Sequence, residues 1–232
     1  MTFLPLIAVL ATLQQPTTPG TYTMSFAVPD SGPMRYALTL PRGYNAKVAR
    51  PLILALHPGG QRFPGYGAQF AQQIVAPGLA DLGAIIVAPD VPTRSWTDPI
   101  ADRAVIGLIR SVMADFNIDR SRVLVAGFSL GGRGAWFHSS RHADIFTAAI
   151  VMAGSAADEP IDGLAKIPTY VIHSKNDEVV DFEPAERTVA ALQKLGRPIA
   201  FAVLEDATHF NMGSYIDPLE QGGQWVAEQW KK

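Results

Sequence analysis

The sequence predicts an α/β fold in three layers, with helices on both sides of a mostly parallel sheet. Short apolar runs alternate along the chain with longer segments whose apolar residues recur every three or four positions. Several short runs are apolar almost without interruption, as in strands that are buried on both faces of a parallel sheet. The two runs nearest the N-terminus flank a cluster of turn residues, which indicates an antiparallel pair at the sheet edge.

Eight runs are predicted to form strands. The N-terminal pair, 21–28 and 34–40, flanks the turn cluster 29–33. The parallel strands are expected at 52–56, 84–88, 123–126, 148–152, 169–172 and 199–204.

The intervening segments are predicted to be helices. The clearest is 102–116, where Val105, Leu108, Ile109, Val112, Met113 and Phe116 follow helical spacing. Further helices are expected at 66–75, 133–141, 183–195 and 222–230. The connection between the strands at 148–152 and 169–172 is short, so we expect no large lid there.

Composition narrows the possible partners. The chain has 232 residues, 48% of them hydrophobic and 17% charged, which suits one folded domain over 21–232. The net charge is −2 and no basic cluster is present, which argues against nucleic acid and anionic membranes as partners. The absence of cysteine excludes disulfides and thiolate chemistry.

The N-terminus resembles a secretory signal. Residues 3–13 are apolar, too few to span a bilayer, and Val9-x-Ala11 is a candidate cleavage triplet. We expect residues 1–20 to be a signal peptide and linker, and the protein to be secreted or periplasmic. No Lys or Arg precedes the run and Pro5 interrupts it, so the alternative is a tail packed on a cytoplasmic domain.

The stretch Gly127-Phe-Ser-Leu-Gly131 lies between a predicted strand and a predicted helix. In this setting Gly-x-Ser-x-Gly indicates a sharp turn that exposes the hydroxyl of Ser129 beside a helix N-terminus. The alternative is a glycine-rich turn in which Ser129 only caps the helix.

A serine nucleophile needs a base, and the base needs an orienting carboxylate. Asp177 and His209 each follow a predicted strand, so both are expected at the same sheet edge as Ser129. Asp177 could instead cap a turn, and the rival carboxylates are Glu178, Asp181 and Asp158.

The other four histidines are not expected to act as the base. We expect His57 in a loop beside the reacting group and His173 in a hydrogen bond to nearby loop backbone. His138 and His142 lie on or after the helix that follows Ser129 and are predicted to be structural or solvent-facing. No HExxH or similar spacing is present, so the sequence predicts no metal and no cofactor.

A negatively charged oxygen formed by nucleophilic attack needs two N–H donors. One is expected from Leu130, the residue after the nucleophile. The other is expected from the loop after the strand at 52–56, first from Gly59 and second from Gly60, since Pro58 has no N–H to donate. A turn without a role is the alternative.

With these motifs in place, the chain resembles the α/β-hydrolase superfamily, and within it small lidless serine esterases related to feruloyl esterases, polyhydroxyalkanoate depolymerases and dienelactone hydrolases. The resemblance runs from about Pro51 to the C-terminus. Its motifs are His57-Pro-Gly-Gly60, Gly127-Phe-Ser-Leu-Gly-Gly132, Ile172-His-Ser-Lys-Asn-Asp177 and Ala207-Thr-His209. It implies an α/β-hydrolase fold with nucleophile Ser129, acid Asp177 and base His209, whose order along the chain is that of the superfamily.

Three positions depart from the family pattern. Pro58 stands where such loops more often have Gly, and Ser174 follows His173 where a Gly is more common. Dienelactone hydrolases proper use a Cys nucleophile, which this chain lacks, so lactone ring opening is disfavoured as its reaction.

The expected function is therefore carboxylic-ester hydrolysis through an acyl-enzyme, on short-chain or aromatic, feruloyl-type esters that are small molecules or attached to a polymer. Trp96 and Arg94 follow the strand at 84–88 and are expected to contact the substrate, although Trp96 could instead pack beneath its loop. Further candidates for the lining of the substrate site are Gln61, Phe63, Tyr66, Phe128 and Phe210. The alternatives are a serine peptidase of the prolyl-oligopeptidase type and a non-catalytic binding protein on the same scaffold.

Overall fold

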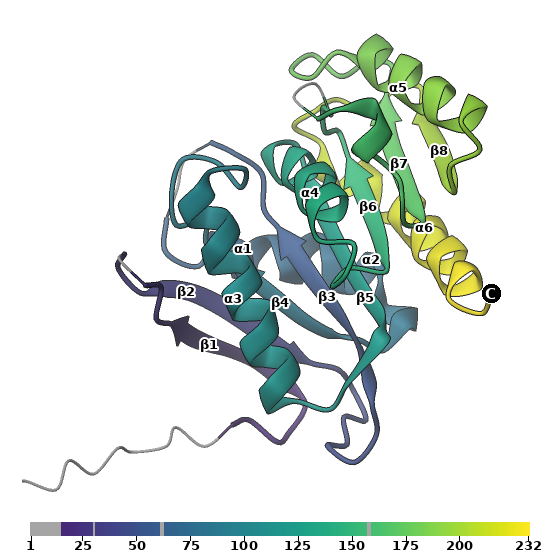
Figure 1. Ribbon diagram of the computed structural model, residues 1–232. Coiled ribbons are helices and arrows are strands. Elements are labelled where there is room, and N and C mark those ends of the chain that lie inside the picture. The colour runs from purple at the N-terminus through teal and green to yellow at the C-terminus, as the bar shows by residue number, and fades with distance from the viewer. Residues whose placement is uncertain (1–14, 30, 61–62, 157–158) are drawn as a thin grey trace, which may run out of the picture.

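The computed structural model describes residues 15–29, 31–60, 63–156 and 159–232 (Figure 1). Its strands are β1 Gly20–Phe26, β2 Met34–Leu40, β3 Arg50–Leu56, β4 Ile85–Pro89, β5 Ile118–Phe128, β6 Ala148–Met152, β7 Thr169–Ser174 and β8 Ile199–Leu204. They form one sheet in the order β1-β2-β4-β3-β5-β6-β7-β8. β2 is antiparallel to both β1 and β4, and every other neighbouring pair is parallel. The predicted eight-stranded sheet with its antiparallel N-terminal edge is confirmed.

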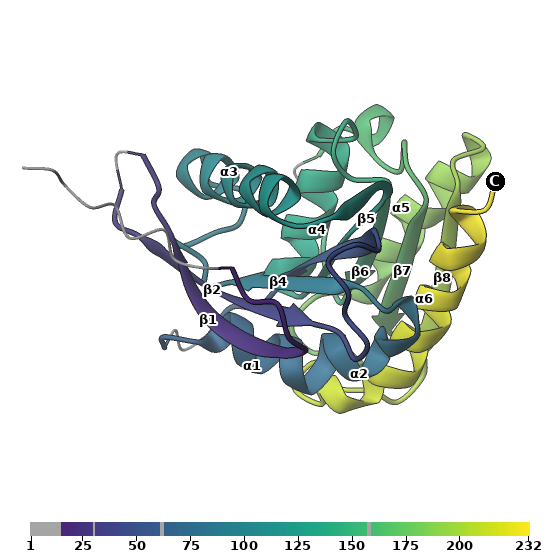
Figure 2. The ribbon, with the colours of Figure 1, turned by 90° about the horizontal axis from the view of Figure 1, so that it is seen from below.

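Helices cover both faces of the sheet (Figure 2). They are α1 Tyr66–Phe70, α2 Ala76–Gly78, α3 Pro99–Asp115, α4 Leu130–Arg141, α5 Phe182–Lys194 and α6 Ile216–Gln229, with a π-helical turn at Ala71–Val75 between α1 and α2. One core cluster packs α3, α4 and α5 against the sheet, and the second packs α1, α2 and α6 against the other face.

The buried part of the central strand β5, residues 123–128, shows why that stretch of sequence is apolar. Val123 and Val125 of β5 belong to one core cluster, whereas Leu124 and Ala126 belong to the other. Successive side chains of a strand point to opposite faces, so a strand covered on both sides has no solvent face to fill with polar residues.

Three helices, α3, α4 and α6, begin at least three residues earlier than predicted, α3 at Pro99 rather than at residue 102. α4 begins at Leu130, directly after Ser129, and α6 begins at Ile216 rather than at residue 222. Gly222 and Gly223 make the middle of α6 look like a turn in the sequence. Both glycines are present because a Cβ atom at either position would collide with a neighbouring side chain. A Cβ atom at Gly222 would lie 2.8 Å from the ring of Tyr170, so the glycines let the helix approach the sheet closely.

The predicted leader lies, up to residue 14, outside the described residues. Between β6 and β7 the described residues contain a single short 3₁₀ turn, Ile161–Gly163, and no lid. None of the helices in the described ranges is long and apolar enough to cross a bilayer.

Candidate active site

Ser129 lies in a strained turn between β5 and α4. Its φ of 55° and ψ of −115° lie outside the regions that a non-glycine residue normally adopts, a strain that costs on the order of 1–3 kcal/mol. Two backbone hydrogen bonds hold it there, because its N–H donates to Met152 O across 2.9 Å and its carbonyl accepts from the N–H of Arg133 across 2.9 Å. The predicted sharp turn is present, and it sets Ser129 at the end of the central strand.

Glycine is required on both sides of this turn. A Cβ atom at Gly127 would lie 2.1 Å from the carbonyl oxygen of Gly131. A Cβ atom at Gly131 would lie 1.9 Å from the carbonyl oxygen of Leu56 in the neighbouring strand. No side chain fits at either position without moving the backbone, so the spacing Gly-x-Ser-x-Gly follows from the close packing of β5, α4 and β3.

The structure brings Ser129, His209 and Asp177 together in one hydrogen-bonded chain. His209 Nε2 is 2.8 Å from Ser129 Oγ, and His209 Nδ1 is 2.9 Å from Asp177 Oδ2. The carboxylate can only accept, so Nδ1 carries the proton and Nε2 is free to accept the proton of the serine hydroxyl. This is the arrangement of nucleophile, base and orienting acid that a serine hydrolase requires.

Asp177 is fully enclosed, with 0% of its side chain exposed. Its Oδ1 accepts hydrogen bonds from the backbone N–H groups of Val179 and Val180, at 3.0 and 2.8 Å. Burial alone raises the pKa of Asp177, but the bonds from His209, Val180 and Val179 outweigh it and hold this pKa below its ordinary value. The carboxylate therefore stays ionised beside His209.

Two residues near Asp177 hold the loops that carry Asp177 and His209. As expected, His173 bonds to loop backbone: its Nε2 donates to the carbonyl of Val180 across 2.8 Å. Glu178, named only as a rival to Asp177, instead accepts the backbone N–H of His209 across 2.9 Å. Sequence reasoning gave Glu178 no separate role, because nothing in the pattern shows which backbone amide a loop carboxylate meets.

The loop that follows β3 lies directly against the start of α4. A Cβ atom at Gly59 would be 3.6 Å from Cβ of Leu130, so the two expected N–H donors belong to segments in contact beside Ser129. Gly60, with a φ of 106°, takes the loop through a left-handed conformation that favours glycine.

Three side chains fix this loop. His57 is 1% exposed; its Nε2 accepts the N–H of Val91 across 3.1 Å, so Nδ1 carries the proton and donates to Pro58 O across 2.7 Å. The indole N–H of Trp96 donates to the carbonyl of His57 across 3.0 Å. The hydroxyl of Tyr66 donates to the carbonyl of Gly59 across 3.4 Å.

The prediction that Trp96 contacts the substrate is corrected by its burial. Trp96 is 0% exposed and packs beneath the loop, where its ring lies 5.0 Å from that of His57. The indole N–H is satisfied by the protein backbone, so Trp96 has neither a free face nor a free donor for a ligand.

A cavity of about 370 Å³ opens at Ser129. Its lining residues are Pro58, Gly59, Gly60, Tyr66, Phe128, Ser129, Val179, His209, Phe210 and Met212. Phe128 and Phe210 therefore lie where they were expected, although Phe128 is 1% exposed and Phe210 is 77% exposed. Exposed Arg94 is not among the lining residues, contrary to expectation, and Gln61 lies outside the described residues.

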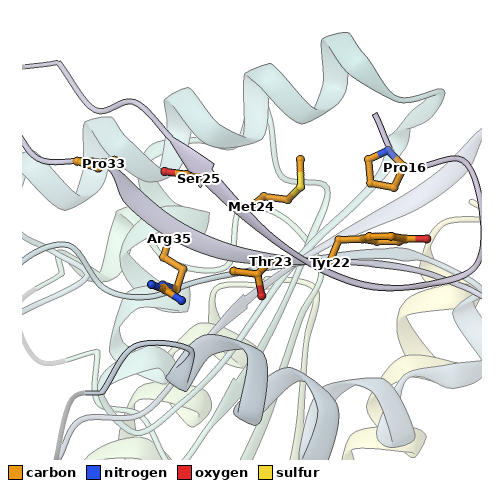
Figure 3. Close-up of a pocket in the computed structure, with 7 residues that line it drawn as sticks. All are labelled: Pro16, Tyr22, Thr23, Met24, Ser25, Pro33 and Arg35. Atoms are coloured by element: carbon orange, nitrogen blue, oxygen red, sulfur yellow. The ribbon is translucent and has the colours of Figure 1, made fainter. Parts of the chain in front are cut away.

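A larger hollow of about 630 Å³ lies at the β1 edge of the sheet (Figure 3). It is lined by Pro16, Tyr22, Thr23, Met24, Ser25, Pro33 and Arg35, from the N-terminal segment and the first two strands. β1 is four strand positions from β5, about 19 Å at ordinary strand spacing. This hollow is therefore separate from Ser129.

The chain is similar to a known family and to known proteins. The model of the "Dienelactone hydrolase family" matches residues 65–215. "Bifunctional acetylxylan esterase/xylanase XynS20E" of Neocallimastix patriciarum is 28% identical over 141 residues, which cover 59% of this chain and 20% of the relative. "Probable feruloyl esterase C" of Aspergillus clavatus is 26% identical over 151 residues, which cover 63% of this chain and 56% of the relative.

Among solved structures, one described as a thermostable esterase superposes with a TM-score of 0.72 and 26% identity, over 90% of this chain and 62% of that one. A ferulic acid esterase superposes with a TM-score of 0.75 and 18% identity, over 93% of this chain and 100% of that one. The predicted α/β-hydrolase fold is confirmed by these superpositions.

Proposed function

The chain belongs to the dienelactone hydrolase family, and we propose that it is a serine carboxylic-ester hydrolase that works through Ser129, His209, Asp177 and an acyl-enzyme intermediate. The observation that carries this proposal is the position of His209, 2.8 Å from Ser129 Oγ and 2.9 Å from Asp177 Oδ2. The family match indicates a hydrolase in general, and the serine at the strained turn supports a mechanism with a serine nucleophile.

In the first half of the proposed reaction, His209 Nε2 takes the hydroxyl proton as Ser129 Oγ attacks the ester carbonyl carbon. Asp177 keeps the imidazole in the tautomer with the proton on Nδ1 and stabilises the imidazolium that forms. The N–H groups of Leu130 and Gly59 bind the oxyanion. His209 then gives its proton to the leaving alkoxide, which departs as the alcohol.

In the second half, His209 accepts a proton from water as the water oxygen attacks the acyl carbon. Collapse of the second tetrahedral intermediate breaks the bond to Ser129 Oγ, which recovers its proton from His209. The products are an alcohol and a carboxylic acid, and the enzyme returns to its starting state.

The proposed substrates are short-chain or aromatic esters. The cavity is lined mainly by apolar side chains, including Phe128, Phe210 and Met212, which suits an uncharged acyl group. The two curated relatives are named for acetyl and feruloyl esters, one short and one aromatic. Solvent-exposed Phe210 could stack on an aromatic acyl ring at the cavity mouth.

The test is turnover of p-nitrophenyl esters from acetate to laurate, with methyl ferulate alongside, by wild type and Ser129→Ala. We expect turnover of acetate or ferulate by wild type and its loss in Ser129→Ala. Phe210→Ala is expected to raise KM for methyl ferulate more than for the acetate ester, whereas the exposed control Val48→Ala leaves both unchanged. Cleavage of a peptide anilide without turnover of any ester would instead support a peptidase.

A further inference from the structure

Three side chains that could ligate a metal meet away from the candidate active site. Asp102 comes from the first turn of α3, His138 from α4, and His142 is the residue directly after α4. His142 Nε2 is 2.7 Å from Asp102 Oδ1, and His138 Nδ1 is 3.4 Å from the same oxygen. One donor atom from each residue lies within 4.8 Å of the other two.

Local structure explains this convergence. His138 and His142 are four residues apart, and the N–H of His142 donates to the carbonyl of His138 across 2.9 Å, so both side chains lie on one helix face. Their rings stack, with centroids 5.9 Å apart. His138 is nine residues beyond Ser129, about 13 Å along a helix. The cluster is therefore separate from the proposed catalytic residues.

His138 supplies an independent observation that points to a ligand. Its side chain is 0% exposed, and its ring nitrogens face only the Asp102 carboxylate, 3.4 Å from Nδ1, and the backbone of Trp96, without a well-aligned hydrogen bond to either among the described residues. A buried imidazole without such partners is unfavourable, because it has lost its hydrogen bonds to water. Its Nδ1 faces the Asp102 carboxylate, where a bound ion would satisfy it.

We propose that Asp102, His138 and His142 bind a divalent cation of the zinc type. Two imidazole nitrogens and one carboxylate oxygen are ligands that zinc accepts, at bond lengths of about 2.0–2.2 Å. In a tetrahedron of that size the ligand atoms are about 3.4 Å apart. The His138–Asp102 separation of 3.4 Å matches this spacing, whereas the His142 ring, whose Nε2 is 2.7 Å from the carboxylate, has to shift for the three donor atoms, now within 4.8 Å of one another, to reach it.

The exposure of the three side chains suits such a site. His138 closes it on the protein side, whereas the side chains of Asp102 and His142 are 25% and 21% exposed. An ion can therefore enter from solvent, and water completes its coordination. The bound ion would fasten the first turn of α3 to the end of α4, a structural role that does not depend on ester hydrolysis.

The experiment uses the full chain, treated with a chelator and then desalted. Zn²⁺ is titrated by calorimetry, and Co²⁺ by visible absorption, which is strong only for tetrahedral or five-coordinate ions. The variants are Asp102→Asn, which preserves side-chain shape, and His142→Ala. Asp115→Asn is the matched control, an exposed carboxylate on the same helix, and His209→Ala removes the imidazole of the candidate active site.

We expect one ion per chain in wild type, Asp115→Asn and His209→Ala. In Asp102→Asn and His142→Ala the affinity should fall by more than the roughly 10–100-fold that loss of a residue merely supporting a ligand costs. Absence of binding to wild type, equal binding by all variants, or loss of binding only in His209→Ala would each overturn the proposal. If one of the two ligand variants fails to fold, the other gives the same comparison. A weak Co²⁺ spectrum of the wild type, typical of octahedral coordination, would also contradict the proposed site.

Discussion

The indole N–H of Trp96 donates a hydrogen bond across 3.0 Å to the backbone carbonyl of His57. This contact joins the loop after β4 to the loop after β3, from which Gly59 is expected to bind the oxyanion. Trp96 is fully buried, so its contribution to the candidate site is to hold the loop in place.

Trp96→Phe is expected to lower kcat with little change in KM. Phenylalanine retains most of the packing but removes the indole N–H that donates to the buried His57 carbonyl, at a cost of about 1–3 kcal/mol of stability. Steady-state kinetics on p-nitrophenyl acetate and methyl ferulate, with urea unfolding, measure both effects. A selective rise in KM for the ferulate ester would show instead that Trp96 contacts the acyl group.

Glu178→Ala is expected to lower kcat by about tenfold, equivalent to about 1.4 kcal/mol, because the loop carrying His209 loses the acceptor of its backbone N–H. Glu178→Gln keeps an acceptor oxygen and should recover most of the activity. The matched control is Glu205→Ala, an exposed carboxylate whose ion pair is with Lys175. Equal kcat values for Glu178→Ala and Glu205→Ala would show that Glu178 does not position the base.

Gly131→Ala is expected to destabilise the fold by about 3 kcal/mol or more, because the new methyl group would lie 1.9 Å from the Leu56 carbonyl oxygen. Gly163→Ala is the control: its Cβ atom meets nothing within 4 Å, so we expect a change within about 1 kcal/mol. Urea unfolding monitored by tryptophan fluorescence compares the two. Similar stabilities would contradict the packing explanation of the turn.

The lowered pKa of Asp177 predicts an acid-sensitive contribution to stability. Folded Asp177 holds its proton less tightly than the unfolded chain, whose ordinary value is 3.8, so the unfolded state takes up the proton first as pH falls. The stabilisation is complete well above pH 3.8 and is lost as pH falls from there through the lower folded value. In urea unfolding at pH 6 to 3, the stability advantage of wild type over Asp177→Asn should shrink below about pH 4. An advantage that grows toward acid pH would contradict the sign.

The convergence of the proposed catalytic residues was accessible from sequence because each of them follows an apolar run. Parallel strands end at one sheet edge, so Ser129, Asp177 and His209 could be placed together before any coordinates were known. The hydrogen bonds of Trp96 and Glu178 could not be predicted. They depend on where a loop side chain meets a distant backbone group, and a single sequence contains no periodicity that records such contacts.

The first residues of two helices also could not be predicted from the sequence. Residues 216–221 of α6 and residues 130–132 of α4 are helical, although Pro218, Gly131 and Gly132 make those stretches look like turns. Proline is tolerated in the first helical turn, and the glycines are present because α4 packs tightly against β3 and β6. Tertiary packing therefore overrides local helix propensity at both helix ends.

The most direct test of the proposed mechanism is labelling of the purified chain with a fluorophosphonate, followed by mass spectrometry of the peptides. An activated serine attacks the phosphorus and displaces fluoride, so we expect one phosphonyl group per chain on Ser129, with strongly reduced labelling in His209→Ala. Labelling at another residue, or no labelling of a folded wild-type chain, would contradict the assignment of Ser129 as a nucleophile activated by His209.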